Sequence, residues 1–313
     1  LGTDGLQIAF EGGIATEADF PSQYTSSQFK WTSGYENYLK ALHYRVKKIR
    51  TFNVLNREGV DKVRNYLWNR GESGKSGGIV TFSSRSGSWT INTNYSGPSE
   101  TGYKALLTKL SPTGAHAMTI VGYDDLVEFE APDGTVSKGA FIVCNTWGEH
   151  HFQHDRGRFY LPYWFWEQSD RDLSELGADM VGTDVEYREP KVVFRVKLDY
   201  SSRDDLAFRI GVSNKASDKL PANDFLVPIA NHQGGDYPMQ GNNSSSEIEF
   251  AFDFSSYIAN INDSAEPKFF LTISRNRRGK VYGSGRILEF SVYDYRESQF
   301  SPKVYVCEGI AGT

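Results

Sequence analysis

Three features are scarce in this chain of 313 residues, and each scarcity argues against one class of protein. The two cysteines, Cys144 and Cys307, are too few for a disulfide framework, and both lie in apolar, strand-like runs, so we expect buried free thiols. No apolar stretch approaches the roughly 18 residues that a transmembrane helix needs, so we expect no membrane span. Runs of Lys and Arg are missing and the net charge is −5, which argues against nucleic acid or an anionic membrane as the main partner.

The remaining composition is that of a globular protein of about two domains by length. Aromatic residues make up 14% of the chain, with 18 Tyr, 20 Phe and 6 Trp. Residue 1 is Leu rather than Met. We therefore expect that translation started upstream and that a segment has been removed or is carried elsewhere.

Before residue 188, helical and strand patterns alternate. The clearest helix covers residues 56–71, with Val60, Val63 and Leu67 on one face and Gly71 as its stop. A shorter helix is expected over residues 4–13. Strands are predicted for "GGIVTFSS" (77–84), "HAMTIVGYDD" (116–125) and "KGAFIVCNTWG" (138–148). The Pro-Asp-Gly turn at 132–134 predicts that the last two pair antiparallel.

After Pro190 the pattern changes to alternating apolar and polar residues. Phe250, Phe252 and Phe254 alternate with Ala251 and two carboxylates, which is typical of strands with one buried face. Six such runs predict an antiparallel β-sandwich; they cover 191–200, 206–213, 246–255, 267–274, 285–295 and 302–309. The domain boundary is predicted between 188 and 189, because Pro190 disfavours a continuing helix.

His116 is the residue with the clearest chemical potential. A histidine acts as a general base when another group fixes its ring orientation and tautomer. Asn145 ends the strand expected to pair with that of His116, so the facing strand ends should bring the two side chains together. Trp147 lies two residues on, where its indole could shield the imidazole–amide hydrogen bond from water. An asparagine-oriented histidine is the arrangement that activates a cysteine.

These segments carry a family resemblance. "GAHAMTIVGYDD", "GAFIVCNTWGEH" and "DRGRFYLPY" resemble the second half of the papain-like (C1-type) cysteine peptidases. In that family a small residue and His begin a strand, a later strand ends in Asn-Ser-Trp-Gly, and a Gly-Tyr turn leads into a final apolar strand. "GLQIAFEGGIATEADFP" upstream is similar to a further family segment. The resemblance covers about residues 5 to 188.

The resemblance implies an α+β fold, in which a papain-like peptidase domain at 1–188 precedes an all-β antiparallel sandwich at 189–313. It implies His116 as catalytic base, Asn145 as its orienter, Trp147 as the shield, and Ala115 and Ala117 beside the substrate cleft. The implied activity is endopeptidase hydrolysis of a peptide or protein substrate through a thioester acyl-enzyme, with no cofactor. We expect a secreted, periplasmic or cell-surface protein.

The sequence departs from the family at three places. Thr146 replaces the usual Ser, and the loop after Trp147 is rebuilt as "EHHFQHDRG". The family's Gln…Cys-Gly-Ser-Cys-Trp segment is absent, and family spacing would put its cysteine roughly 14 to 34 positions before Leu1. Strand alternation turns Cys144 away from the Asn145 face, and Cys307 belongs to the sandwich. We therefore expect the nucleophile on a Cys-bearing N-terminal segment or a separate chain.

Other interpretations compete with this one. The protein could be a catalytically inactive papain-fold binding protein, a pseudo-peptidase with a sandwich that serves adhesion or binds carbohydrate. His116 could also be a structural core residue. His150, His151 and His154 could be read as metal ligands, but no partner cluster supports zinc and a solvated loop is favoured.

Overall fold

The computed structural model describes residues 3–21, 29–227, 230, 234–262, 265–275 and 283–307. Contacts divide the chain into two compact units, Lys47–Asp184 and a second one formed by Gly2–Val46 with Val185–Thr313. The contacts divide the chain after Asp184, and the domain boundary between 188 and 189 stays a prediction. At the N-terminal end the structure differs from the prediction, because the first 46 residues group with the C-terminal strands. None of the described helices is long and apolar enough to cross a membrane.

The reason for this grouping is a set of contacts between helix α2 (Tyr35–Leu42) and the C-terminal strands. Tyr35 and Leu42 form a buried cluster with Val193, and the Tyr35 hydroxyl hydrogen-bonds that of Tyr295 at 2.8 Å. The guanidinium of Arg45 also forms a buried ion pair in this unit, at 2.6 Å from the Asp253 carboxylate. These partners are far apart in sequence, so no local pattern signals them.

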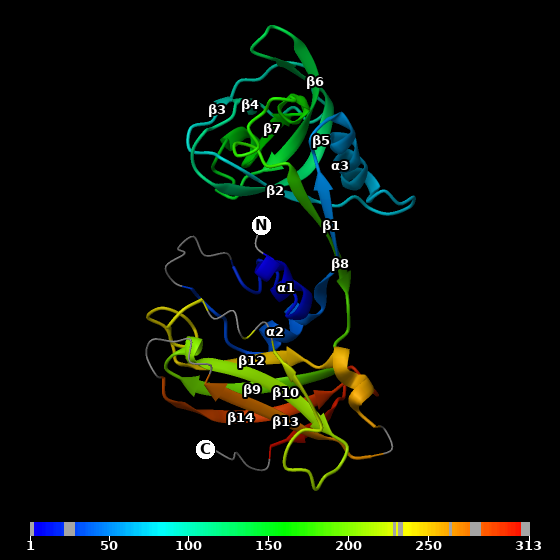
Figure 1. Cartoon of the computed structure of the whole chain (residues 1–313), viewed down its shortest axis with the longest axis vertical. Helices are drawn as coiled ribbons and strands as arrows, with labels where there is room; N and C mark the ends of the chain where they lie inside the picture. Colours follow the sequence, from blue (N-terminus) through cyan, green and yellow to red (C-terminus); the bar gives the residue numbers. More distant parts are fainter. Residues whose placement is uncertain are drawn as a thin grey trace. The chain divides into compact units, whose positions relative to one another are not determined.

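The first unit is built on an eight-stranded sheet of order β1-β8-β2-β5-β6-β7-β4-β3 (Figure 1). The unit boundaries fall inside β1 and β8. The strands are β1 (Tyr44–Asn53), β2 (Val80–Ser84), β3 (Thr90–Asn92), β4 (Leu106–Lys109), β5 (His116–Glu130), β6 (Val136–Cys144), β7 (Arg158–Pro162) and β8 (Asp179–Tyr187). Two helices accompany them, α3 (Arg57–Asn69) and the short α4 (Trp164–Glu167).

Helix α3 confirms the prediction for residues 56–71. The side chain of Asn56 caps it by accepting a hydrogen bond from the Gly59 amide at 3.2 Å. Its apolar face buries Val60, Val63 and Leu67 in the core of the first unit.

Strands β5 and β6 pair antiparallel, as the Pro-Asp-Gly turn predicted. Ile120 faces Val143 and Tyr123 faces Phe141, with bulges that shift the register at two places. Ile120, Phe141 and Val143 are buried in the same core. This hairpin fixes the positions at which β5 begins and β6 ends.

The second unit is a β-sandwich of two antiparallel sheets, of order β11-β10-β13 and β12-β9-β14-β15. One core contains side chains from both sheets. All six predicted runs form strands within the described residues, 308 and 309 at the end of the last run lying outside them, and the short β11 is one that the sequence did not predict. The strands are β9 (Val192–Tyr200), β10 (Leu206–Ser213), β11 (Asn223–Leu226), β12 (Glu247–Asp253), β13 (Lys268–Arg275), β14 (Gly285–Asp294) and β15 (Lys303–Val306), and helix α1 (Thr3–Glu11) belongs to the same unit.

Candidate active site

The structure brings His116 and Asn145 together at the end of the β5–β6 hairpin. His116 is the first residue of β5 and pairs with Ser84 of β2, and Asn145 directly follows β6. The ring Nε2 of His116 lies 2.8 Å from Oδ1 of Asn145. His116 is half-buried, whereas Asn145 is only 6% exposed. The predicted strand pairing therefore accounts for the contact.

Asn145 is held by three hydrogen bonds, the one to His116 and two to backbone groups. Its backbone N–H donates to the carbonyl oxygen of Gly157 at 2.9 Å, and its Oδ1 accepts the Thr146 N–H at 2.8 Å. The Thr146 N–H identifies this atom as the amide oxygen, because only an acceptor can receive that hydrogen. An amide oxygen cannot donate a hydrogen to His116, so Nε2 carries the ring proton in the neutral form. Nδ1 is then the ring atom with the free lone pair. Among the described residues, no side chain or backbone group is hydrogen-bonded to Nδ1.

Two indoles surround the imidazole. Trp147 stacks on His116 with ring centroids 4.7 Å apart and an interplanar angle of 23°. Trp89, on the segment before β3, lies 6.1 Å from the His116 ring and 5.9 Å from that of Trp147. An aromatic face attracts a cation, so both rings suit an imidazole that becomes charged. The sequence indicated Trp147, but it missed Trp89, because a lone Trp in "SGSWT" has no periodic pattern.

Asp155 ties the rebuilt loop after Trp147 to the segment just before β4. This buried carboxylate accepts the backbone N–H groups of Lys104 at 2.8 Å and Ala105 at 2.6 Å. At the end of the loop Gly157 has a φ of +75°, and a Cβ there would lie 2.7 Å from the carbonyl oxygen of Gly148. The loop therefore ends at a constrained residue, Gly157, whose carbonyl oxygen accepts the backbone N–H of Asn145. The sequence gave no sign of the role of Asp155.

Neither cysteine joins this site. No disulfide joins the two cysteines, and both are only partly buried, which differs from the predicted burial. Cys144 pairs with Thr119 across β5–β6, and its Sγ lies 3.9 Å from the backbone oxygen of Asn145. Cys307 follows β15 in the second unit and donates its backbone N–H to Phe290 at 3.0 Å. In the first unit the site thus holds a histidine and its asparagine, and the Cys144 thiol contacts a backbone oxygen rather than the ring.

The other predicted positions lie close by along the chain. Ala115 and Ala117 flank His116, and both are exposed. His151 lies edge-on to Trp147 at 4.8 Å, while His150 and His154 are exposed. Within the described ranges no group of three or more His, Cys, Asp or Glu side chains could hold a metal ion.

Comparison with solved structures gives only distant likenesses. No family model and no curated protein match the chain. One similar structure contains the cysteine protease and lectin-like domains of Cwp84, a surface layer associated protein of Clostridium difficile; the alignment has 14% identity and a TM-score of 0.37, and covers 90% of this chain and 61% of that one. Another is SERA5E from Plasmodium falciparum, with 16% identity and a TM-score of 0.28, covering 57% and 64%.

This chain thus spans less than two thirds of the length of either structure. At TM-scores below 0.5, such likenesses do not establish a common fold. The proposed function therefore rests on the geometry around His116.

Proposed function

We propose that His116 and Asn145 form the acid–base half of a papain-like cysteine peptidase site that hydrolyses peptide bonds. The observation that carries the proposal is the hydrogen bond of 2.8 Å between Nε2 and Oδ1. It leaves the Nδ1 lone pair available for a thiol proton. We assign the nucleophilic cysteine to a Cys-bearing N-terminal segment or chain outside residues 1–313.

The chemistry follows from this ring orientation. Nδ1 of His116 takes the proton of the external thiol, and the thiolate attacks the scissile carbonyl carbon of a peptide or protein substrate. Nδ1 then gives the proton to the departing amine, which leaves a thioester. In the second half, Nδ1 accepts a proton from water as the water attacks the thioester, and the thiol is restored. Asn145 keeps the ring oriented throughout, and Trp147 limits the access of water to the imidazole–amide bond.

A second function has one observation in its favour. The Sγ of Cys144, the cysteine of the same unit, contacts the backbone oxygen of Asn145 rather than the His116 ring, as a pseudo-peptidase that only binds its ligands would allow. Against it stands the fixed imidazole–amide pair, for which binding alone has no use. In either case we propose a secreted, periplasmic or cell-surface location, and a role for the sandwich in docking a large substrate or partner.

The deciding experiment is thiol mapping on the protein isolated from its source. Intact mass and N-terminal sequencing identify any Cys-bearing segment, and alkylation with iodoacetamide over a pH series locates reactive thiols by mass spectrometry. We expect a third thiol, beyond Cys144 and Cys307, that reacts well below the ordinary thiol pKa of about 8.5. In His116→Ala this reactivity should move up toward pH 8.5. His150→Ala, which removes an exposed histidine from the neighbouring loop, should leave it unchanged.

Two outcomes would decide against the peptidase. A protein with no third thiol would be a binding protein. A third thiol with the same alkylation profile in wild type and His116→Ala would show that His116 does not activate it.

A further inference from the structure

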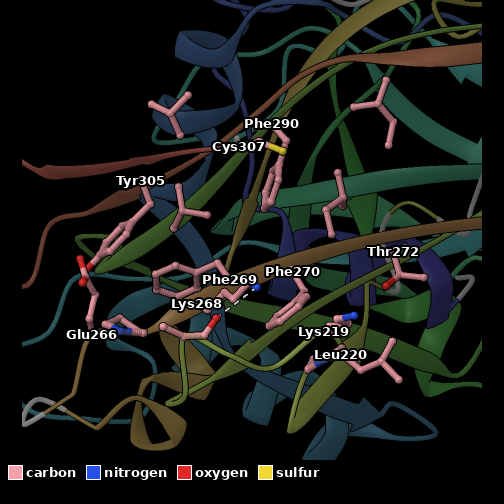
Figure 2. Close-up of a pocket in the computed structure, with 17 residues that line it drawn as sticks. Lys219, Leu220, Glu266, Lys268, Phe269, Phe270, Thr272, Phe290, Tyr305 and Cys307 are labelled. Carbon is pink, nitrogen blue, oxygen red and sulfur yellow. Dashed lines mark hydrogen bonds between the residues drawn. The ribbon is translucent and has the colours of Figure 1, made fainter. Parts of the chain in front are cut away.

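The β-sandwich has an open cavity of about 770 Å³ along one side (Figure 2). Its walls come from β13 on one sheet and from β14 and β15 on the other. Phe269 of β13 lies edge-on to Tyr305 of β15 with ring centroids 5.0 Å apart, Leu271 and Phe290 also line the cavity, and the exposed Lys268 lies at its rim (Figure 2). The cavity is therefore bounded by a strand that ends its sheet in the described part of the chain.

The backbone direction of β10 can be read from one hydrogen bond. The N–H of Val227, just after β11, donates to the carbonyl oxygen of Phe208 at 3.0 Å. The backbone groups of Phe208 therefore point toward β11. Because these directions alternate along an antiparallel strand, those of Arg209 and Gly211 point toward β13.

The register of β13 then shows which of its groups are unused. Thr272 faces Arg209 and Phe270 faces Gly211, so these two residues exchange hydrogen bonds with β10. By alternation, the N–H and C=O groups of Phe269, Leu271 and Ile273 point away from β10. No strand within the described ranges pairs with that edge. β13 thus presents a row of unpaired donors and acceptors beside the cavity.

The side chains of the same three residues point into the sandwich. Phe269, Leu271 and Ile273 pack against its core but stay partly exposed, whereas Phe208 of the adjacent strand is fully buried. Phe290 on the opposite sheet is also partly exposed. The inner faces of both sheets are therefore partly exposed at this edge. One additional strand with apolar side chains at alternate positions would cover them.

The charge at the rim points to the chemistry of the occupant. Lys219 and Lys268 are exposed lining residues, and Lys268 Nζ donates to the backbone oxygen of Asp218 at 2.8 Å. The one acidic lining residue, Glu266, lies 3.9 Å from the ammonium of Lys303. The rim thus carries an excess of positive charge at the end of the free edge, which favours an acidic residue opposite Lys268.

We propose that this edge is a docking site for an extended peptide segment of a partner protein. The segment adds as a strand beside β13 and forms backbone hydrogen bonds with Phe269, Leu271 and Ile273. Its apolar side chains, at every second position, fill the cavity against Phe290 and Tyr305. Acidic residues at the intervening positions lie on the outer face beside Lys268. A segment of about five to eight residues matches the length of β13.

The test uses a fluorescein-labelled heptapeptide, Val-Glu-Val-Glu-Val-Glu-Val, titrated with the whole chain by fluorescence anisotropy. We expect saturable binding. The same composition with the valines grouped together should bind at least tenfold more weakly, because only alternation places all apolar side chains on one face. N-methylation of alternate amides, tried in both registers, should abolish binding in one register and spare it in the other, because only one set of amides reaches β13.

A matched pair of protein variants tests the charge. Lys268→Glu should weaken binding of the acidic peptide roughly two- to tenfold and strengthen that of a peptide with Lys in place of Glu. Lys48→Glu makes the same charge change at an exposed site in the first unit and should alter neither. Absence of saturable binding, or equal binding of the alternating and grouped peptides, would overturn the proposal. A dimer in sedimentation that excludes the peptide would also overturn it, since the edge would belong to a second copy.

Discussion

Replacing Asn145 by Ala separates orientation of the imidazole from stability of the fold. The substitution removes Oδ1, which accepts hydrogen bonds from the His116 ring and from the Thr146 N–H. It also removes Nδ2, a buried amide nitrogen with no hydrogen-bond partner among the described residues. The two losses act in opposite directions on the free energy of unfolding.

The two losses nearly cancel in the free energy of unfolding, but they do not cancel in the ratio of the two neutral tautomers of His116. Two hydrogen bonds of about 1 kcal/mol each are lost, while removal of an unpaired buried donor returns about 1–3 kcal/mol. The unfolding free energy should therefore change by no more than about 1 kcal/mol. The bond to His116 forms only when Nε2 carries the proton. Losing about 1 kcal/mol from that tautomer alone shifts the ratio of the two neutral forms about fivefold toward Nδ1–H, since 1.4 kcal/mol corresponds to a factor of ten.

The assay is a long-range ¹H–¹⁵N correlation spectrum of the histidine rings, recorded on the labelled chain at a pH where they are neutral. In the wild type, His116 should show a protonated Nε2 and an unprotonated Nδ1. Asn145→Ala should move both shifts toward the average of the two tautomers, while His150 stays unchanged. A wild-type ring protonated at Nδ1 would refute the assignment, as would a large loss of stability with an unaltered tautomer ratio.

Four further expectations follow from buried groups, all measurable by denaturant or thermal unfolding. Asp155→Ala should lower the unfolding free energy by about 2–4 kcal/mol, because two backbone N–H groups lose their acceptor; an unchanged midpoint would contradict this. Gly157→Ala should cost about 1–3 kcal/mol, because Ala strains a φ of +75° and its Cβ meets a carbonyl oxygen at 2.7 Å; wild-type stability would show that the loop adapts freely. Burial raises the pKa of Asp124, but hydrogen bonds from three backbone N–H groups outweigh this effect and hold that pKa below its ordinary value. The stability that this carboxylate adds should be complete above the unfolded pKa of about 3.9 and should be lost as pH falls through the folded pKa. Thermal melts of Asp124→Asn should lack that loss. Replacing either member of the Arg45–Asp253 pair alone should cost about 3–5 kcal/mol, and replacing both by apolar residues should cost less than the two single changes together, since no unpaired buried charge remains; additive single costs in a double-mutant cycle would contradict the coupling.

The parts of the fold that the sequence predicted depend on short-range patterns. Alternation and a Pro-Asp-Gly turn were enough to pair β5 with β6, and this pairing alone brings His116 to Asn145. Helix α3 was predicted because Val60, Val63 and Leu67 follow at helical spacing and Gly71 gives a stop, and the structure adds Asn56 as its cap. The six predicted sandwich strands were indicated by the alternation of apolar and polar residues.

The parts that escaped prediction depend on partners distant in sequence. Tyr35 meets Tyr295 across 260 positions, and this contact helps to assign α2 to the second unit. Asp155 accepts hydrogen bonds from the backbone of Lys104 and Ala105, just before β4, and nothing near it in sequence reveals them. Trp89 reaches the site from an irregular segment. The catalytic roles of His116 and Asn145 stay predictions, because the structure shows their geometry and not their reactivity.

The stacking of Trp147 on His116 has an optical consequence. An indole in face-to-face contact with an imidazole, here at 4.7 Å, changes its emission when that imidazole gains a positive charge. Trp147 is 45% exposed and so is also open to collisional quenchers. The protein therefore carries an indole at the group proposed to move protons, and comparison with Trp147→Phe would identify the part of the emission of its six tryptophans that responds to proton uptake.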